Sequence, residues 1–89
     1  MWFVYILKCS DNSFYVGITN DLQKRIEKHQ KGKGAKYTKG RRPVVLQGFF
    51  VVSNKSIALK EEHRIKQLSR ADKILLICSL NEQNNQKLS

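Results

Sequence analysis

Five side chains of this 89-residue sequence have types suited to proton transfer, phosphate binding or metal binding: Tyr5, Tyr15, Arg25, His29 and Glu62. Arg25 and His29 are four residues apart, so a helix would point both the same way. Arginine offers phosphate a rigid fork of donors, histidine relays protons near neutral pH, and a carboxylate can hold a divalent cation. Each residue alone has an ordinary alternative, as a packing aromatic, a side chain extending outward or a surface charge.

Both tyrosines belong to apolar runs that the sequence predicts as strands. Residues 2–7 form a continuous run of aromatic and β-branched residues, and residues 14–18 alternate in polarity. The cluster at residues 10–13 has turn composition. We expect an antiparallel hairpin that carries Tyr5 on its first strand and Tyr15 on its second.

The number of loop residues decides where the tyrosines point. An odd loop pairs Tyr5 with Gly17 and Leu7 with Tyr15, which places both tyrosines on one face of the sheet. An even loop places them on opposite faces. In the odd case, Gly17 leaves a space opposite Tyr5 through which a substrate backbone could approach.

A helix is predicted from Asp21 to about Lys31, with Asn20 as its N-cap. Gly32 and Gly34 follow its end. Helical spacing places four of its residues on one face: Leu22, Arg25, Ile26 and His29. The arginine and histidine therefore border the side of the helix that packs inward.

The rest of the chain predicts a basic loop at 36–42, a strand at 44–52 interrupted by a bulge near Gly48, a helix at 57–68 and a short final helix after Ser69. Three apolar residues of the final helix are expected to pack back on the sheet: Ile74, Leu75 and Ile77.

These elements run strand, strand, helix, strand, helix, helix. They predict an α/β (α+β) fold with a small three-stranded antiparallel sheet flanked by two to three helices. The length allows one domain, which we place at residues 1–80, followed by a polar tail at 81–89 that we expect to be disordered. The apolar N-terminal run stops at Lys8 and is too short to span a membrane, so no membrane association is expected.

The formal charge of +10 is concentrated in one segment. Residues 23–42 hold nine basic residues and a single acidic one, a net +8. Such a segment attracts polyanions, of which nucleic acid is the most common; a solubilising surface or anionic lipid is the alternative. The candidate contacts to nucleic acid are Gly17, Lys24, Lys33, Lys36, Tyr37, Lys39, Arg41 and Arg42.

The cysteines do not have the spacing of a zinc site. Cys9 and Cys78 are far apart in the sequence, and neither has a partner at two-residue spacing. With no secretory segment, reduced thiols and a cytoplasmic location are expected.

Taken together, Tyr5, Tyr15, Arg25, His29 and Glu62 give a specific combination, and it resembles the GIY-YIG nuclease family in its small single-domain bacterial branch. The resemblance covers about residues 2–75. The stretches that carry it are Val4–Ile6, Tyr15–Leu22, Gly32–Thr38, Arg41–Val44 and Ala58–Lys66.

The resemblance implies a metal-dependent endonuclease that hydrolyses nucleic-acid phosphodiesters, with DNA expected as the substrate in preference to RNA. Repair or recombination would fit the family as its process. It implies a single divalent cation, Mg²⁺ or Mn²⁺, held by Glu62. A motif tyrosine would activate water, Arg25 would steady the phosphate, and His29 would take the proton from Tyr5 or Tyr15.

This sequence departs from the family pattern at the first motif. Phe3 stands where that motif has glycine, and Val4 and Val16 replace its isoleucines. Many family nucleases carry a second domain that selects the target, so a protein partner is expected to supply target specificity here. Two alternatives stay open: a non-catalytic basic module that binds nucleic acid on the same fold, and a basic interaction protein with no nucleic-acid role.

Overall fold

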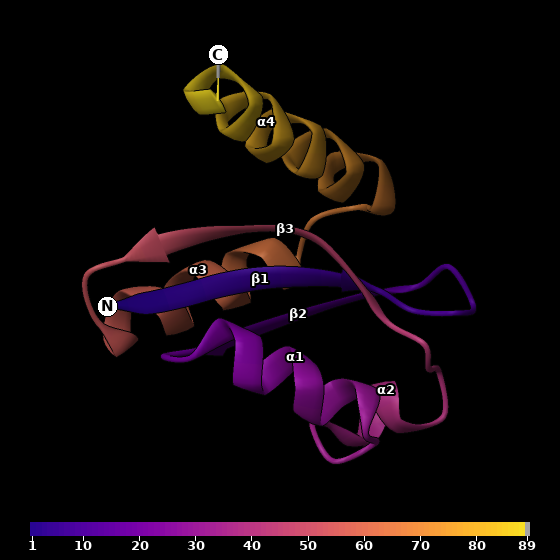
Figure 1. Ribbon diagram of the computed structural model, residues 1–89. Coiled ribbons are helices and arrows are strands. Elements are labelled where there is room, and N and C mark those ends of the chain that lie inside the picture. The colour runs from indigo at the N-terminus through magenta and orange to yellow at the C-terminus, as the bar shows by residue number, and fades with distance from the viewer. Residues whose placement is uncertain (89) are drawn as a thin grey trace.

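A three-stranded antiparallel sheet forms the centre of the protein. The computed structural model describes the backbone of residues 1–88 and the side chains of residues 1–83. The strands β1 (Trp2–Lys8), β2 (Phe14–Thr19) and β3 (Val45–Val52) are arranged in the order β2-β1-β3. The predicted α+β class and the order of the elements are confirmed (Figure 1).

The hairpin between β1 and β2 has the odd register. Tyr5 pairs with Gly17 and Leu7 pairs with Tyr15, so the two tyrosines share one face of the sheet. The predicted irregularity in β3 is also present. The register with β1 shifts between Ile6 and Leu7, where the partners are Gly48 and Leu46, which leaves Gln47 as the extra residue.

Helix α1 (Leu22–Gln30) begins one residue later than the sequence predicted. Asp21, and not Asn20, is the N-cap, and its carboxylate accepts the Lys24 N–H. The physical reason is a turn at the end of β2, because the Thr19 hydroxyl accepts the Asp21 N–H at 3.1 Å and fixes Asn20 in that turn.

The basic segment after α1 is not entirely a loop. Its first residues form a single helical turn, α2 (Lys36–Lys39), where the sequence predicted irregular structure. The Lys39 N–H closes the turn on the Ala35 carbonyl at 3.1 Å, and the Thr38 side chain points inward with no exposed surface. No local sequence pattern predicts a buried side chain in such a basic segment.

Helix α3 (Lys55–Lys66) and helix α4 (Arg70–Leu88) complete the chain. Of the three residues expected to pack back, Ile77 is buried but Ile74 and Leu75 are exposed, so that part of the prediction is wrong for those two. Leu80, which contacts the surface of Gly48 on β3, takes the packing role instead. Helix α4 continues through the segment predicted as a tail, while Ser89 lies outside the described residues and the domain boundary at residue 80 stays a prediction.

The sheet separates two apolar clusters, as strand alternation requires. On one face, side chains of α1 pack against Tyr5, Leu7 and Tyr15. On the other, side chains of α3 and α4 pack against Val4, Ile6 and Val16. Figure 1 shows the sheet between α1 and α3, with α4 alongside β3. The tyrosines therefore face α1, where His29 and Arg25 lie.

Candidate active site

A buried chain of hydrogen bonds links the first strand to α1 and α2. The Tyr5 hydroxyl lies 2.8 Å from Nε2 of His29, and Nδ1 of the same imidazole lies 2.8 Å from Oγ1 of Thr38. The Thr38 hydroxyl in turn donates to the Ala35 carbonyl at 3.2 Å. Tyr5, His29 and Thr38 have no exposed surface, so water does not compete for these bonds.

The end of this chain fixes the direction of every bond in it. A carbonyl only accepts, so the Thr38 proton points to Ala35, and the Thr38 oxygen is left to accept the Nδ1–H of His29. Nε2 then carries no proton and accepts from the Tyr5 O–H. The proton order is Tyr5 to His29 to Thr38 to Ala35, with a neutral imidazole in the middle.

The pKa shifts agree with that assignment. Burial raises the pKa of Tyr5 from 10.0 to about 12, and the Arg25 guanidinium only partly opposes it. Burial lowers the pKa of His29 from 6.5 to about 4, with repulsion from Arg25 as the second cause. At neutral pH both groups are therefore uncharged, with the proton on the Tyr5 oxygen.

Two glycines permit this arrangement. A Cβ at Gly17 would overlap the end of the Tyr5 side chain, with the Cζ atom at 2.6 Å, and a Cβ at Gly34 would lie 2.5 Å from Nδ1 of His29. The expectation of an open space beside Gly17 is wrong, because the ring of Tyr5 itself fills it. Gly17 is buried and serves the site by leaving room for the tyrosine.

Tyr15 is the more accessible of the paired tyrosines. It is half-buried, its ring centroid lies 6.4 Å from that of Tyr5 and 5.1 Å from that of His29, and its outer side stacks on Tyr37 at 6.0 Å. The Arg41 guanidinium covers Tyr37 at 4.1 Å from the ring centroid. The result is a ladder of rings from the buried Tyr5 outward to an exposed tyrosine on α2.

Glu62 lies on α3. Burial is the main cause of the raised pKa of Tyr5; Arg25 and Tyr15 also act on that hydroxyl, and the charge of Glu62 raises its pKa by the smallest amount. The Glu62 carboxylate is largely covered and lies 3.7 Å from Lys66, one turn further along the helix. Glu61 differs, because it pairs with Arg64 at 2.7 Å on a more exposed side.

Arg25 is held beside the tyrosines by the chain that follows α1. Its guanidinium donates to the Gly34 carbonyl at 2.7 Å, which leaves further N–H groups of the fork for a ligand. Arg25 also lines a hollow of 280 Å³ together with Thr19, Asp21, Lys24 and Lys28. Three cations outweigh the one carboxylate, so the hollow has a net positive charge and polar walls, which suit a phosphate.

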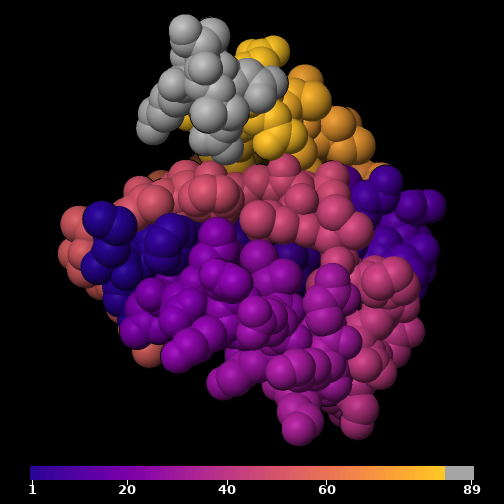
Figure 2. Space-filling view, viewed as in Figure 1, coloured from indigo at the N-terminus to yellow at the C-terminus, as the bar shows by residue number. Residues whose placement is uncertain are grey.

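The predicted nucleic-acid contacts divide into exposed cations and residues that hold the segment together. Lys24, Lys33, Lys36 and Lys39 are exposed. Arg41 pairs with Asp11 at 2.9 Å and Arg42 donates to the carbonyls of Lys39 and Gln30, so both arginines also bind backbone or neighbouring groups. Figure 2 shows the segment from α1 through α2, in violet to rose, covering the lower part of the near face.

The carboxylate set fits a cation of the magnesium type bound by one protein ligand. Among the side chains that the structure describes, no group of three or more His, Cys, Asp or Glu residues converges on a point. Mg²⁺ is commonly held by one or two carboxylates, with waters and substrate phosphates completing its shell. Glu62, largely covered and paired with Lys66, has the carboxylate chemistry for that role.

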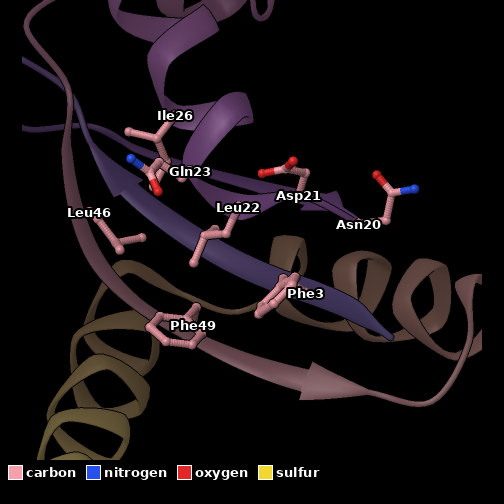
Figure 3. Close-up of a pocket in the computed structure, with 8 residues that line it drawn as sticks. All are labelled: Phe3, Asn20, Asp21, Leu22, Gln23, Ile26, Leu46 and Phe49. Atoms are coloured by element: carbon pink, nitrogen blue, oxygen red, sulfur yellow. The ribbon is translucent and has the colours of Figure 1, made fainter.

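An apolar pocket of 570 Å³ lies between the start of α1 and strand β3 (Figure 3). Phe3, Leu22, Ile26 and Phe49 point into it, and the rings of Phe3 and Phe49 lie 6.0 Å apart. Phe3, which replaces the motif glycine, thus packs beside β3.

Sequence reasoning missed several side chains that the structure places in or next to the candidate site. Thr38 fixes the orientation of His29 although nothing in its local sequence marks it as buried. Lys66 pairs with Glu62, and its spacing of four residues on a predicted helix was a usable signal. Trp2, Lys28 and Lys55 gather at the end of β2 from three separate elements, so no sequence spacing relates them.

The comparison with family models places this fold in a nuclease family. A family model described as the GIY-YIG catalytic domain matches residues 1–74, and the chain belongs to this family. Among the residues described, no helix is long and apolar enough to cross a bilayer.

Within the family the chain is similar to UPF0213 proteins. One of these, from Halobacterium salinarum, is 51% identical over 82% of this chain and 95% of the relative. Another, from Clostridium perfringens, is 51% identical over 98% of this chain and 96% of the relative. The solution NMR structure of a UPF0213 protein from Bacillus halodurans superposes with a TM-score of 0.57 at 46% identity, covering 88% of this chain and 84% of that one.

Proposed function

We propose that this protein is a metal-dependent endonuclease that hydrolyses nucleic-acid phosphodiesters, with DNA as its substrate. The observation that carries the proposal is the arrangement of Tyr15 and Arg25 around the buried Tyr5–His29 pair, with the charge of Glu62 also felt at the Tyr5 hydroxyl. An acid–base group, a phosphate-binding cation and a metal-binding carboxylate are the parts that phosphodiester hydrolysis needs.

The two tyrosines have different roles in this proposal. Tyr5 keeps its proton, because burial raises its pKa to about 12, and its O–H donates a hydrogen bond to Nε2 of His29. Both residues therefore position the site. Tyr15, half-buried and next to His29, is the tyrosine that meets the attacking water. Arg25 binds the scissile phosphate with the donors that Gly34 leaves free.

Glu62 would hold Mg²⁺ or Mn²⁺ at this site. When bound, the cation polarises the phosphate and stabilises charge on the leaving oxygen. Lys66 lies 3.7 Å from the same carboxylate, so a cation bound there would take its place beside Glu62. Glu61, engaged with Arg64, takes no part.

The exposed cations of the segment at residues 23–42 attract the substrate backbone in this proposal. They carry no means of reading base sequence, so a protein partner would supply target selection. We place the reaction in the cytoplasm, where the free thiols Cys9 and Cys78 remain reduced.

A cleavage assay with paired carboxylate variants tests the proposal. Labelled single-stranded, branched and duplex DNA and RNA would be incubated with Mn²⁺ or EDTA and with wild type, Glu62→Gln or Glu61→Gln. Metal-dependent cutting should fall by about 100-fold or more in Glu62→Gln, the scale seen when a transition-state contact is removed. Glu61→Gln, with the same loss of charge one residue away, should stay within about threefold.

A non-catalytic binding module is the second candidate, and the exposed lysines outside the site favour it. Binding to DNA that weakens steeply with salt, without cutting of any substrate and equally in all three proteins, would establish this candidate and refute the nuclease.

A further inference from the structure

A hollow of 370 Å³ lies at the end of β2, separate from the apolar pocket of Figure 3. Its size is within the range of sites that take small organic ligands. Trp2, Ile18 and Thr19 line it from the sheet, and Arg25, Lys28 and Lys55 line it from two helices. The hollow thus combines an apolar floor with three cations.

Trp2 is the aromatic side chain of this hollow. It is half-buried, and one side packs against the core cluster that includes Val4 and Ala58. The Lys55 ammonium lies over the ring, 5.5 Å from its centroid. Lys55 is exposed and has a flexible stem, so its ammonium can leave the ring for a phosphate and uncover the indole.

The hollow adjoins the candidate active site. Arg25 lines it and also acts on Tyr5, so one guanidinium belongs to both places. Lys55 and Glu62 are seven residues apart on α3, which places them on one side of the helix about 10 Å apart along its axis. A strand whose phosphate meets Arg25 and Glu62 would carry its next nucleotide toward Trp2.

We propose that this hollow binds one unstacked nucleotide of the substrate strand, next to the scissile phosphate. The base lies on Trp2, and Lys28 and Lys55 hold the adjacent phosphate. A base inside a duplex does not present its face to a side chain, whereas an unpaired base does so at little cost. Resting on the nuclease function proposed above, this names the substrate class as DNA with an unpaired nucleotide at the cut, rather than continuous duplex.

Trp2 is the single tryptophan of the chain, so its fluorescence reports on this hollow alone. The Glu62→Gln protein in EDTA would be titrated with a labelled oligothymidylate about six nucleotides long, following label anisotropy and tryptophan emission together. Emission should be quenched with the same midpoint as the anisotropy change. A blunt-ended duplex long enough to stay fully paired should bind about tenfold more weakly and leave the emission unchanged, because stacking on one base is worth about that much.

Two lysines of α3 provide a matched comparison. Lys55→Ala should weaken oligothymidylate binding about tenfold, whereas Lys60→Ala, an equal charge change at an exposed position outside the hollow, should change it by less than about threefold. Saturable binding that leaves the tryptophan emission unchanged, equal effects of the two lysine variants, or no binding at all would overturn the hollow. Wild-type cleavage decides the nuclease separately: cutting without quenching refutes only the hollow, and quenching without cutting refutes only the nuclease.

Discussion

Thr38→Val removes the Thr38 hydroxyl from the buried chain, and with it the acceptor for His29 and the donor to the Ala35 carbonyl, which still accepts the Lys39 N–H. The Thr38 hydroxyl accepts the Nδ1–H of His29 at 2.8 Å, and valine has nearly the same shape without that acceptor. Neither residue has exposed surface, so water cannot replace the lost partner. Among the described side chains, no buried nitrogen or oxygen lacks a hydrogen-bond partner, and this variant would create one.

The magnitude follows from leaving a buried donor unsatisfied, which costs about 1–3 kcal/mol. We expect the free energy of unfolding to fall by about 2 kcal/mol. For a domain of this length, each kcal/mol lowers the melting temperature by about 4–8 °C, so the midpoint should fall by about 8–16 °C. The imidazole should also lose its fixed tautomer, since Nδ1–H would no longer have an acceptor.

Urea and thermal denaturation followed by circular dichroism would measure the stability change. Thr38→Ser is the matched control, because it keeps the hydroxyl and loses a methyl group worth about 0.8 kcal/mol. Nitrogen chemical shifts of the His29 ring would show the proton on Nδ1 in the wild type and in the serine variant.

Three results would refute this reasoning. A Thr38→Val protein as stable as the wild type within about 0.5 kcal/mol would mean that the hydroxyl contributes nothing. A Thr38→Ser protein destabilised as strongly as Thr38→Val would assign the effect to packing. A wild-type His29 protonated on Nε2 would reverse the proton order assigned to the whole chain.

Two further predictions concern the same cluster. The pKa of His29 is about 4 in the folded protein and 6.5 in the unfolded chain, so its contribution to stability is complete above pH 6.5 and is lost as the pH falls toward 4. The loss is at most about 3 kcal/mol, and urea midpoints measured from pH 7 to 4 should fall accordingly. A His29→Gln variant with the same pH dependence would contradict this assignment. Gly17→Ala should lower the free energy of unfolding by about 1–3 kcal/mol and reduce cleavage, because the added methyl group meets the Tyr5 ring. Gly40→Ala, whose methyl group has no atom within 4 Å, should change the free energy of unfolding by less than about 0.5 kcal/mol in the same urea assay. Equal effects of the two variants would show that the contact with Tyr5 is unimportant.

The sequence by itself determined the elements that position the site. Period-two alternation and an apolar run predicted β1 and β2, and helical spacing put Arg25 and His29 on one face of α1. These are local patterns, because each depends on residues a few positions apart. The charge of the segment at 23–42 was equally readable, since it is a sum over neighbours in the sequence.

The number of residues in the loop between β1 and β2 is a feature that the sequence left undecided. The sequence predicted that a loop with an odd number of residues would place Tyr5 and Tyr15 on one face, but only the observed strand register decided between an odd and an even loop. Asn20 and Asp21 are both good N-caps by type, and the turn made by the Thr19 hydroxyl selected Asp21.

Only the tertiary structure decided which of the predicted residues are buried and which meet solvent. Tyr5 and Tyr15 look alike in their motifs, yet α1 and α2 close over the first and leave the second half-open. Thr38 became the partner of His29 because a turn of helix folds back from nine residues away. Desolvation depends on every segment packed around a group, so the pKa of Tyr5 could not follow from local sequence.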